Sequence, residues 1–341
     1  MNEKEVITCV KPLVRAETWE KYINKKGGVS YKAEFLERDF YDQIKENPKN
    51  WAYWNGNKYR RIDLIPCGKC IECQLAYARQ WAVDCMLEKF YWPDNECWFL
   101  TITYDDEHLP TAQYETEDGK IYKGISLRKK DIQDFWKRLR KHYKCKCKYL
   151  VVGEYGSETQ RPHYHAIVFG LPLDTKELKY FGCNTNGDSY WTNDELNKVW
   201  GKGNIICGYV TFKSISYVAR YTIKKWKNKD TNMNKRMGRM PEFICMSQGI
   251  GYRYYKEYKE KLLEEDQVTT SNGQMPLPKR FMKQLREKDI ELYTTLKTKH
   301  KKIAEMAEKE RLSKTDLKPE DERKTREKRI NNNFKDIRRK T

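Results

Sequence analysis

The chain lacks any apolar stretch long enough to span a membrane, which excludes a membrane-spanning helix. It contains no G-x-x-x-x-G-K-S/T sequence, so it encodes no P-loop helicase. Its first ten residues, MNEKEVITCV, include acidic side chains and no apolar core of a signal peptide, which predicts a reducing cytosolic environment. The eleven cysteines, an odd number, are therefore expected to be free or metal-bound thiols instead of a disulfide framework.

Positive charge is abundant. The 341 residues include 68 Lys and Arg against 49 Asp and Glu, which gives a net charge of +19 and a pI near 9.3. This balance argues for a polyanionic partner, most simply nucleic acid. The 24 Tyr and 10 Trp suit base stacking on single strands, and core packing is the alternative role for each ring.

Two histidines separated by one residue, His163 and His165, lie in an apolar and aromatic run that ends at Gly170. The run predicts a strand, because aromatic and β-branched residues favour extended backbone. Residues two apart in a strand share one face, so the two imidazoles are expected side by side. Two neutral imidazoles on one rigid element supply two thirds of a divalent-metal site.

Glu154 is the candidate for the third ligand. It belongs to a second predicted strand, Tyr149 to Tyr155, and lies close to the turn that joins this strand to the histidine strand as a hairpin. A carboxylate biases such a site towards Mg²⁺ or Mn²⁺, although two histidines and one glutamate also suit zinc. The alternative is an ion pair between Glu154 and a nearby arginine such as Arg161.

Two tyrosines four residues apart, Tyr217 and Tyr221, lie in a predicted helix from Ser216 to Trp226. Their spacing places them on one face, together with Lys224 or Lys225. A phenol is a weak nucleophile at neutral pH because its pKa is about 10, but a metal on a phosphate and nearby cations lower the barrier to its attack. Core packing is the alternative for this pair, and the spacing leaves open which lysine faces the metal.

A cysteine cluster, Cys67, Cys70 and Cys73, has the spacing that lets thiolates converge on one tetrahedral ion, which makes a structural zinc site a candidate. The alternative is a set of reduced cysteines that cap a predicted helix at about 72–91. Three ligands need a fourth, and the candidates for it are Cys9, Cys85 and Cys97.

The remaining elements predict an α+β protein. Trp98 to Tyr104 is expected to form a central strand, 111–125 a polar loop, and 171–206 a polar insert with a short helix at 192–199 that could act as a lid or an origin-reading loop. Further strands are expected at Gly208–Phe212 and Pro241–Met246. From about residue 274 charged residues dominate, which predicts helix over 279–312, disorder over 313–341 and an electrostatic tether for DNA.

A basic amphipathic helix is predicted from Leu127 to Tyr143, since its apolar residues recur at helical spacing. Its polar positions are rich in Lys and Arg, which are interpreted either as a solvated face or as a stripe that contacts the DNA backbone. The candidate DNA-contacting residues of this helix are Lys137, Arg138, Arg140 and Lys141.

The motif HYH followed by YVARYTIKK resembles the HUH superfamily of rolling-circle replication initiators, and most closely the two-tyrosine initiators of gokushoviruses within the Microviridae. The segments that carry the resemblance run from about 66 to 255 in the order of the family. They are PCGKCIECQLAYARQWAVDCM (66–86), WFLTITYDDEHLP (98–110), DFWKRLRKHY (134–143), VVGEYG with RPHYHAIVFG (151–170) and YVARYTIKKW (217–226).

The resemblance implies a ferredoxin-like HUH endonuclease core, an antiparallel sheet with flanking helices, at 93–265. A Cys-rich N-terminal region at 1–92 precedes it, and a basic helical to disordered tail at 266–341 follows it. In this family the strand at Trp98–Tyr104 has a structural or DNA-contacting role, so Thr101 and Thr103 are further candidates.

The resemblance also implies an activity. A Mg²⁺ or Mn²⁺ ion on His163, His165 and Glu154 polarises a phosphodiester at the phage origin, and Tyr217 or Tyr221 attacks it. The products are a 5′-phosphotyrosine link and a free 3′-OH that primes a host polymerase, and the second tyrosine later allows the circle to be rejoined. Three further residues are expected to steady the phosphates: Arg220, Lys224 and Lys225.

The implied partners are the origin DNA and, since the chain has no helicase motif, a host helicase in the bacterial cytoplasm. Two alternatives stay open. One is a non-enzymatic protein that coats or packages single-stranded DNA. The other is a tyrosine transposase or plasmid initiator with the same chemistry.

Overall fold

The structure is a computed structural model that describes residues 9, 12–24, 27–36, 53–54, 57–115, 119–156, 158–184, 187–224, 238–270 and 273–339. The chain divides into two compact units. Unit 1 is Tyr77–Tyr293, and unit 2 combines Glu5–Ala76 with Thr294–Thr341. These boundaries differ from the predicted ones at 92 and 265, because the two ends of the chain share one unit.

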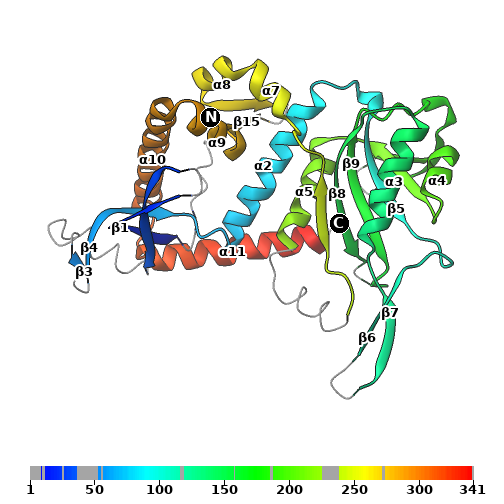
Figure 1. Ribbon diagram of the computed structural model, residues 1–341, viewed down its shortest axis with the longest axis horizontal. Helices are drawn as coiled ribbons and strands as arrows, with labels where there is room; N and C mark the ends of the chain where they lie inside the picture. The colour runs from blue at the N-terminus through cyan, green and yellow to red at the C-terminus, as the bar shows by residue number, and fades with distance from the viewer. Residues whose placement is uncertain are drawn as a thin grey trace. The chain divides into compact units, whose positions relative to one another are not determined.

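Unit 1 is built on a seven-stranded antiparallel sheet (Figure 1). This confirms the predicted α+β class with an antiparallel sheet and flanking helices. From one edge to the other, its strands are β10 (Lys179–Cys183), β11 (Ser189–Thr192), β12 (Ile205–Tyr209), β5 (Cys97–Thr103), β9 (Pro162–Phe169), β8 (Lys148–Tyr155) and β13 (Phe243–Met246).

The two faces of this sheet have different coverings. On one face Trp98 and Tyr164 pack in a single apolar cluster with α3 (Lys129–His142) and α4 (Asp194–Trp200). The predicted amphipathic helix is thereby confirmed, with its core residues at the expected positions: Ile132, Phe135, Trp136 and Leu139. The alternate residues of β5, β8 and β9 point to the other face, which α5 (Phe212–Lys224) covers.

Helix α2 (Ile71–Lys89) carries two buried acidic side chains that anchor its surroundings in unit 1. Glu88 accepts hydrogen bonds from Lys148 Nζ and from the backbone N–H of Gly251, both at 2.9 Å. Gly251 has a φ of +74°, and a Cβ there would lie 2.8 Å from the carbonyl oxygen of Asp84, so only glycine fits this approach. Asp84 accepts a hydrogen bond from Tyr255 and lies 3.6 Å from Arg280 Nε.

The other elements of unit 1 are shorter. Two 3₁₀ turns lie at Asp94–Glu96 and Thr175–Glu177. The C-terminal part of the unit contains α7 (Tyr252–Glu257), α8 (Lys259–Glu265), the hairpin β14 (Gln267–Thr270) and β15 (Gly273–Pro276), and α9 (Lys279–Lys288).

Two predicted loops are strands in the structure. The segment 111–125 was expected to be a polar loop, but it forms the hairpin β6 (Thr111–Glu115) and β7 (Ile121–Ile125). The insert at 171–206 was expected to be a lid or an origin-reading loop. It instead adds β10 and β11 to the edge of the main sheet, and its predicted short helix is present as α4.

Unit 2 contains a second antiparallel sheet, in the order β2 (Val29–Leu36), β1 (Leu13–Ile23), β4 (Asn57–Ile65) and β3 (Tyr53–Trp54). Helix α10 (Ile290–Ser313) ends in this unit, and α11 (Pro319–Arg339) belongs to it entirely (Figure 1). The prediction of disorder over 313–341 is therefore wrong for the residues that α11 contains. In the described part of the chain, no helix is both long enough and apolar enough to cross a bilayer.

Charged side chains are buried where α11 meets the first turn of α2 within unit 2. Arg326 Nε lies 3.0 Å from Glu72 Oε1, with both side chains at most a tenth exposed, and Arg311 Nε lies 3.0 Å from Glu322 Oε1. Buried charges are tolerated only when they are paired, so these contacts hold α11 in place. This segment is thus part of a folded unit, in contrast to the solvated tether that its composition predicts.

Replacing Arg326 with Ala leaves the buried Glu72 carboxylate without its cation. We expect this change to lower the local stability of α11 by about 3 kcal/mol, because breaking a buried ion pair leaves an uncompensated charge. Amide hydrogen exchange of α11 peptides measures the loss. The control Lys328→Ala removes an exposed charge from the same helix and should change protection little; equal loss in both variants would contradict the role of the pair.

Burial raises the pKa of the Asp84 carboxyl to about 6, although the hydrogen bond from Tyr255 and the charge of Arg280 act in the opposite direction. The folded state therefore holds this proton more tightly than the unfolded chain, whose Asp pKa is about 3.9. Unit 1 should lose stability, by about 2–3 kcal/mol, as the pH rises from about 4 to 7.

We expect Asp84→Asn to remove this part of the pH dependence, measured as urea unfolding of unit 1 at pH values across that range. Asp94→Asn is the matched control, since the Asp94 side chain is 82% exposed. A pH profile that Asp84→Asn leaves unchanged would show that Asp84 does not titrate in this window.

Candidate nuclease site on the sheet face under α5

The β8–β9 hairpin sets the site. Its strands pair so that Glu154 lies directly opposite His163, while Val152 lies opposite His165. The turn between the strands is closed by the backbone hydrogen bond from Gly156 N–H to the carbonyl of Arg161 (3.0 Å). Because the side chains of a strand alternate, this register puts Glu154 and both histidines on the face that α5 covers.

The three predicted ligands converge. Glu154 Oε1 lies 3.1 Å from His163 Nε2 and 3.2 Å from His165 Nε2, and the three ligand atoms lie within 4.8 Å of one another. Glu154 is 3% exposed and His165 is 8% exposed, while His163 is half-buried. The structure thus places the residues as the sequence predicts, and the group can hold a metal ion.

The hydrogen bonds of the two rings fit metal binding. His163 Nδ1 lies 3.1 Å from the carbonyl oxygen of Arg161, which can only accept, so this nitrogen carries the proton. In the neutral ring Nε2 then presents a lone pair towards Glu154, an arrangement that a cation between them stabilises. Thr101 Oγ1 lies 3.1 Å from His165 Nδ1 and orients that ring in the same way.

Both predicted tyrosines reach this cluster from α5. Tyr217 OH lies 3.3 Å from His165 Nε2, and Tyr221 OH donates a hydrogen bond of 2.5 Å to Tyr217 OH. The ring of Tyr221 stacks on His165 with 5.9 Å between centroids, and Phe99 packs against Tyr217 edge-on. The helix begins at Phe212, four residues earlier than predicted. Two phenolic oxygens therefore lie beside the two imidazoles.

Burial raises the pKa of Tyr217 to about 12, against the hydrogen bond from Tyr221. It raises the pKa of Tyr221 further above the usual range, and the negative charges of Glu154 and Tyr217 add to the shift. Both phenols are therefore neutral near pH 7 in the ion-free protein, and a cation held by Glu154 would favour their ionisation. Burial also lowers the pKa of the neighbouring Arg220, which the charges of both tyrosines oppose.

The other predicted DNA contacts are distributed differently. Arg138 donates to the carbonyls of Val199 and Trp200 at 2.9 Å, and Arg140 donates to the carbonyl of Cys147 at 2.8 Å, so both guanidinium groups support the fold. They belong to α3, on the sheet face opposite the tyrosines, as do the exposed Lys137 and Lys141. The side chain of Lys224 and all of Lys225 lie outside the described residues.

Two alternatives from the sequence are resolved by the contacts. Arg161 Nη1 lies 2.5 Å from Asp106 Oδ1, and its Nη2 donates to the carbonyl of Tyr104, whereas Glu154 faces the histidines. The role of Thr101 as the partner of His165 was not predicted specifically. The signal that could have found it is the alternation in Trp98–Tyr104, since β5 pairs Thr101 with His165.

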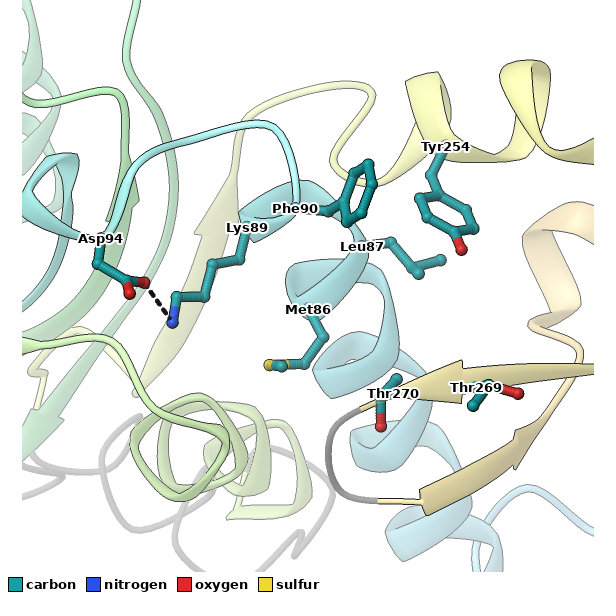
Figure 2. Close-up of a pocket in the computed structure, with 8 residues that line it drawn as sticks. All are labelled: Met86, Leu87, Lys89, Phe90, Asp94, Tyr254, Thr269 and Thr270. Carbon is teal, nitrogen blue, oxygen red and sulfur yellow. Dashed lines mark ion pairs between the residues drawn. The ribbon is translucent and has the colours of Figure 1, made fainter.

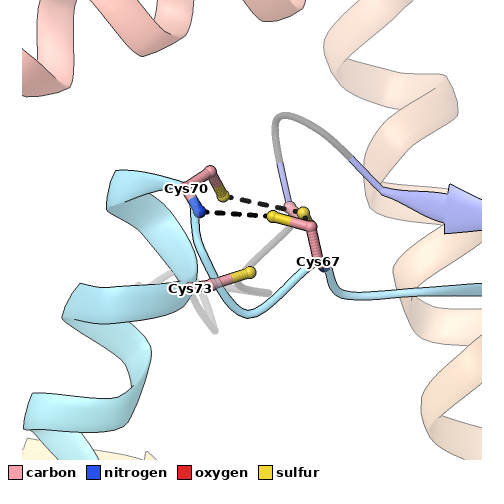
Figure 3. Close-up of side chains that lie close together, drawn as sticks. Cys67, Cys70 and Cys73 are labelled. Carbon is pink, nitrogen blue, oxygen red and sulfur yellow. Dashed lines mark hydrogen bonds between the residues drawn. The ribbon is translucent and has the colours of Figure 1, made fainter. Parts of the chain in front are cut away.

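A second group of possible metal ligands lies in unit 2. The Sγ atoms of Cys9, Cys67, Cys70 and Cys73 lie within 4.8 Å of one another, which selects Cys9 as the fourth member of the predicted cluster (Figure 3). The other two candidates, Cys85 and Cys97, are buried in unit 1. Hydrogen bonds from the thiols of Cys73 and Cys9 hold the pKa of Cys70 well below its usual range.

The structure also contains an open pocket of about 370 Å³ in unit 1, lined mainly by apolar and aromatic side chains from α2, α7 and β14 (Figure 2). Lys89 and Asp94 pair across one side of it at 2.8 Å. None of its lining residues belongs to β5, β8, β9 or α5, so this pocket is separate from the histidine–tyrosine cluster.

Comparison with known proteins gives one consistent result. The family model for the phage replication-associated protein ORF2 matches residues 97–226, which run from β5 to the end of α5 and contain the whole cluster. The replication-associated protein ORF2 of Spiroplasma virus 4 is 35% identical over 267 residues, which cover 74% of this chain and 78% of that protein. The replication-associated protein VP4 of Bdellovibrio phage phiMH2K is 33% identical over 247 residues, which cover 71% and 75%. No solved structure matches this chain.

The fold and the site thus define an α+β protein with a two-histidine, one-carboxylate cluster beneath a two-tyrosine helix. With the matches above, the chain belongs to the family of phage replication-associated proteins. This confirms the predicted resemblance to the replication initiators of gokushoviruses.

We expect Glu154→Gln to weaken Mn²⁺ binding more than about tenfold, because even changes to residues that only orient a metal ligand cost about 10–100-fold in affinity. Mn²⁺ is a suitable probe since thiolates bind it poorly. Calorimetric titration of both variants gives the ratio. The exposed Glu158 of the neighbouring turn provides the control Glu158→Gln, and equal affinities in the two variants would rule out Glu154 as a ligand.

Proposed function

We propose that this protein initiates rolling-circle replication by nicking and rejoining the phage origin strand through tyrosine. The observation that carries this proposal is the convergence of two imidazoles, one buried carboxylate and two phenols on one sheet face. Each group has a separate use in phosphoryl transfer. The family relationship to phage replication-associated proteins supports the same assignment.

His163, His165 and Glu154 would hold the Mg²⁺ or Mn²⁺ ion, because their ligand atoms converge and their Nδ1 hydrogen bonds leave Nε2 available. When bound, the ion supplies Lewis-acid polarisation of the scissile phosphate. The buried carboxylate also provides the negative charge that makes the pocket attractive to a cation.

The phenolic oxygen of Tyr217 or Tyr221 attacks phosphorus, and the bond from phosphorus to the 3′-oxygen of the preceding nucleotide breaks. The proton lost by the phenol balances the one gained by the leaving 3′-oxygen. The 5′-phosphate remains on the tyrosine, so the energy of the broken bond is conserved and later joining needs no ATP. The free 3′-OH primes a host polymerase.

Two nucleophiles in contact suit a reaction that cuts twice. After one round of synthesis, the tyrosine that is still free cuts the regenerated origin, and the released 3′-OH attacks the first phosphotyrosine to close the circle. Because the two hydroxyl groups are hydrogen-bonded to each other, both lie within reach of the same phosphate position. Arg220, whose charge interacts with both phenols, would steady the phosphate, together with Lys224 and Lys225.

The proposal requires partners that the chain does not replace. It has no P-loop sequence, so a host helicase would separate the strands, and the reaction would take place in the cytoplasm of the bacterial host. The net charge of +19 favours binding to the origin DNA.

A test uses purified protein with Mn²⁺ or Mg²⁺ and origin-derived single-stranded DNA, and it detects covalent adducts on a denaturing gel. We expect Tyr217→Phe and Tyr221→Phe each to retain an adduct, and the double variant to lose it by more than about 1,000-fold, since removal of a nucleophile leaves little residual rate. Tyr252→Phe is the matched control because its ring is exposed and lies outside the site.

The other outcomes separate the alternatives. Loss of the adduct in one single variant alone would identify a one-tyrosine enzyme, as expected of some transposases and plasmid initiators. DNA binding without an adduct under either metal would exclude the nuclease and leave a DNA-coating or packaging protein. An adduct with ends of a mobile element in place of the phage origin would identify a transposase.

A further inference from the structure

We propose that Cys9, Cys67, Cys70 and Cys73 bind one structural Zn²⁺ ion that fastens the segment before β1 to the start of α2 within unit 2. The inference does not depend on the tyrosine chemistry, because its residues belong to another unit of the chain. It rests on the geometry of the four sulfur atoms, on the backbone around them and on the small core of the unit.

The sulfur atoms are spaced as a tetrahedral zinc site requires. All four lie within 4.8 Å of one another, and Cys9 Sγ lies 3.6 Å from Cys70 Sγ. In a regular tetrahedron with Zn–S bonds of about 2.3 Å, the sulfur atoms are about 3.8 Å apart. Side chains that only cap a helix have no reason to collect a fourth thiol from residue 9, which is 58 residues before Cys67.

The backbone is arranged to stabilise thiolates. The N–H groups of Lys69 and Cys70 point to Cys67 Sγ at 3.4 and 3.2 Å, and the N–H of Cys67 points to Cys9 Sγ at 3.3 Å. The turn between the first two ligands of the motif has Gly68 at a φ of +72°, which lets the chain fold back around the sulfur atoms. Such N–H···S contacts reduce the charge of bound thiolates and orient them (Figure 3).

The donor set selects the metal and its role. Thiolates are soft ligands, so four of them favour zinc over Mg²⁺ or Mn²⁺. Four protein ligands leave no position for water or substrate, which makes the site structural and distinguishes it from the cluster of Glu154 and the two histidines. Cys70 and Cys73 are also buried, so the ion would be shielded from solvent.

Unit 2 needs such a fastening. The buried apolar cluster of its sheet is small, consisting of Val14, Ala16 and Tyr59 with Leu36 and Ile62 packed against it. Small units with few buried apolar side chains are commonly stabilised by a metal or by disulfides. The proposed ion would join residues on both sides of the sheet in the sequence, since Cys9 precedes β1 and Cys67 follows β4.

The test measures zinc in the full-length protein, purified without metal-binding tags and dialysed against a mild chelator. We expect about one zinc per chain in the unaltered protein, less than a tenth of that in Cys9→Ser, and near-full content in Cys9→His, because histidine is also a zinc ligand. Cys183→Ser, which removes an exposed thiol outside the cluster, should keep its zinc. The histidine variant keeps the test valid if the serine variant folds poorly.

Replacement of zinc by Co²⁺ gives an independent readout, since thiolate–cobalt bonds absorb in the near ultraviolet. We expect this absorption to persist in His163→Ala and in the double variant Tyr217→Phe, Tyr221→Phe, and to vanish in Cys9→Ser. Zinc that follows His163, zinc that survives Cys9→Ser, or a disulfide between Cys9 and Cys70 on non-reducing peptide mapping would each overturn the proposal.

Discussion

The pairing of β8 with β9 is the constraint on which the candidate active site depends. It places Glu154 opposite His163 and sets both histidines on the face beneath α5. A slip of one residue would turn every one of these side chains to the opposite face, into the apolar cluster around Tyr164. The tight turn after Gly156 fixes this register, and the pairing of Thr101 with His165 on β5 fixes it again from the other side.

The two faces of the central sheet divide structural and chemical tasks. One face is filled by large side chains, among them Trp98, Trp136 and Trp200, and provides the rigidity that holds β5, β8 and β9 in place. The other face buries carboxylate, imidazole and phenol groups where an apolar core would stabilise the fold more. A protein tolerates such a polar interior when the groups are mutually hydrogen-bonded, as Glu154, His165 and the tyrosines are.

The sequence predicts the site better than it predicts the periphery. Period-2 spacing of His163 and His165, and four-residue spacing of Tyr217 and Tyr221, are local signals that the structure reproduces as shared faces. The hairpin at 111–125 was missed because its polar strands form an isolated two-stranded sheet without a buried face to impose alternation. Helix α11 was missed because it has no regular apolar stripe, and its placement depends on the contact of Arg326 with Glu72, which is remote in sequence.

The composition of unit 2 from both ends of the chain has a consequence for biosynthesis. A ribosome completes Tyr77–Tyr293 while the residues that follow Thr294 are still unmade. Unit 1 can therefore fold on the nascent chain, whereas Glu72 of the N-terminal segment must wait for Arg326 to emerge. The part of the protein that carries the histidines and tyrosines is thus assembled first, and the first-translated residues are among the last to reach their final partners.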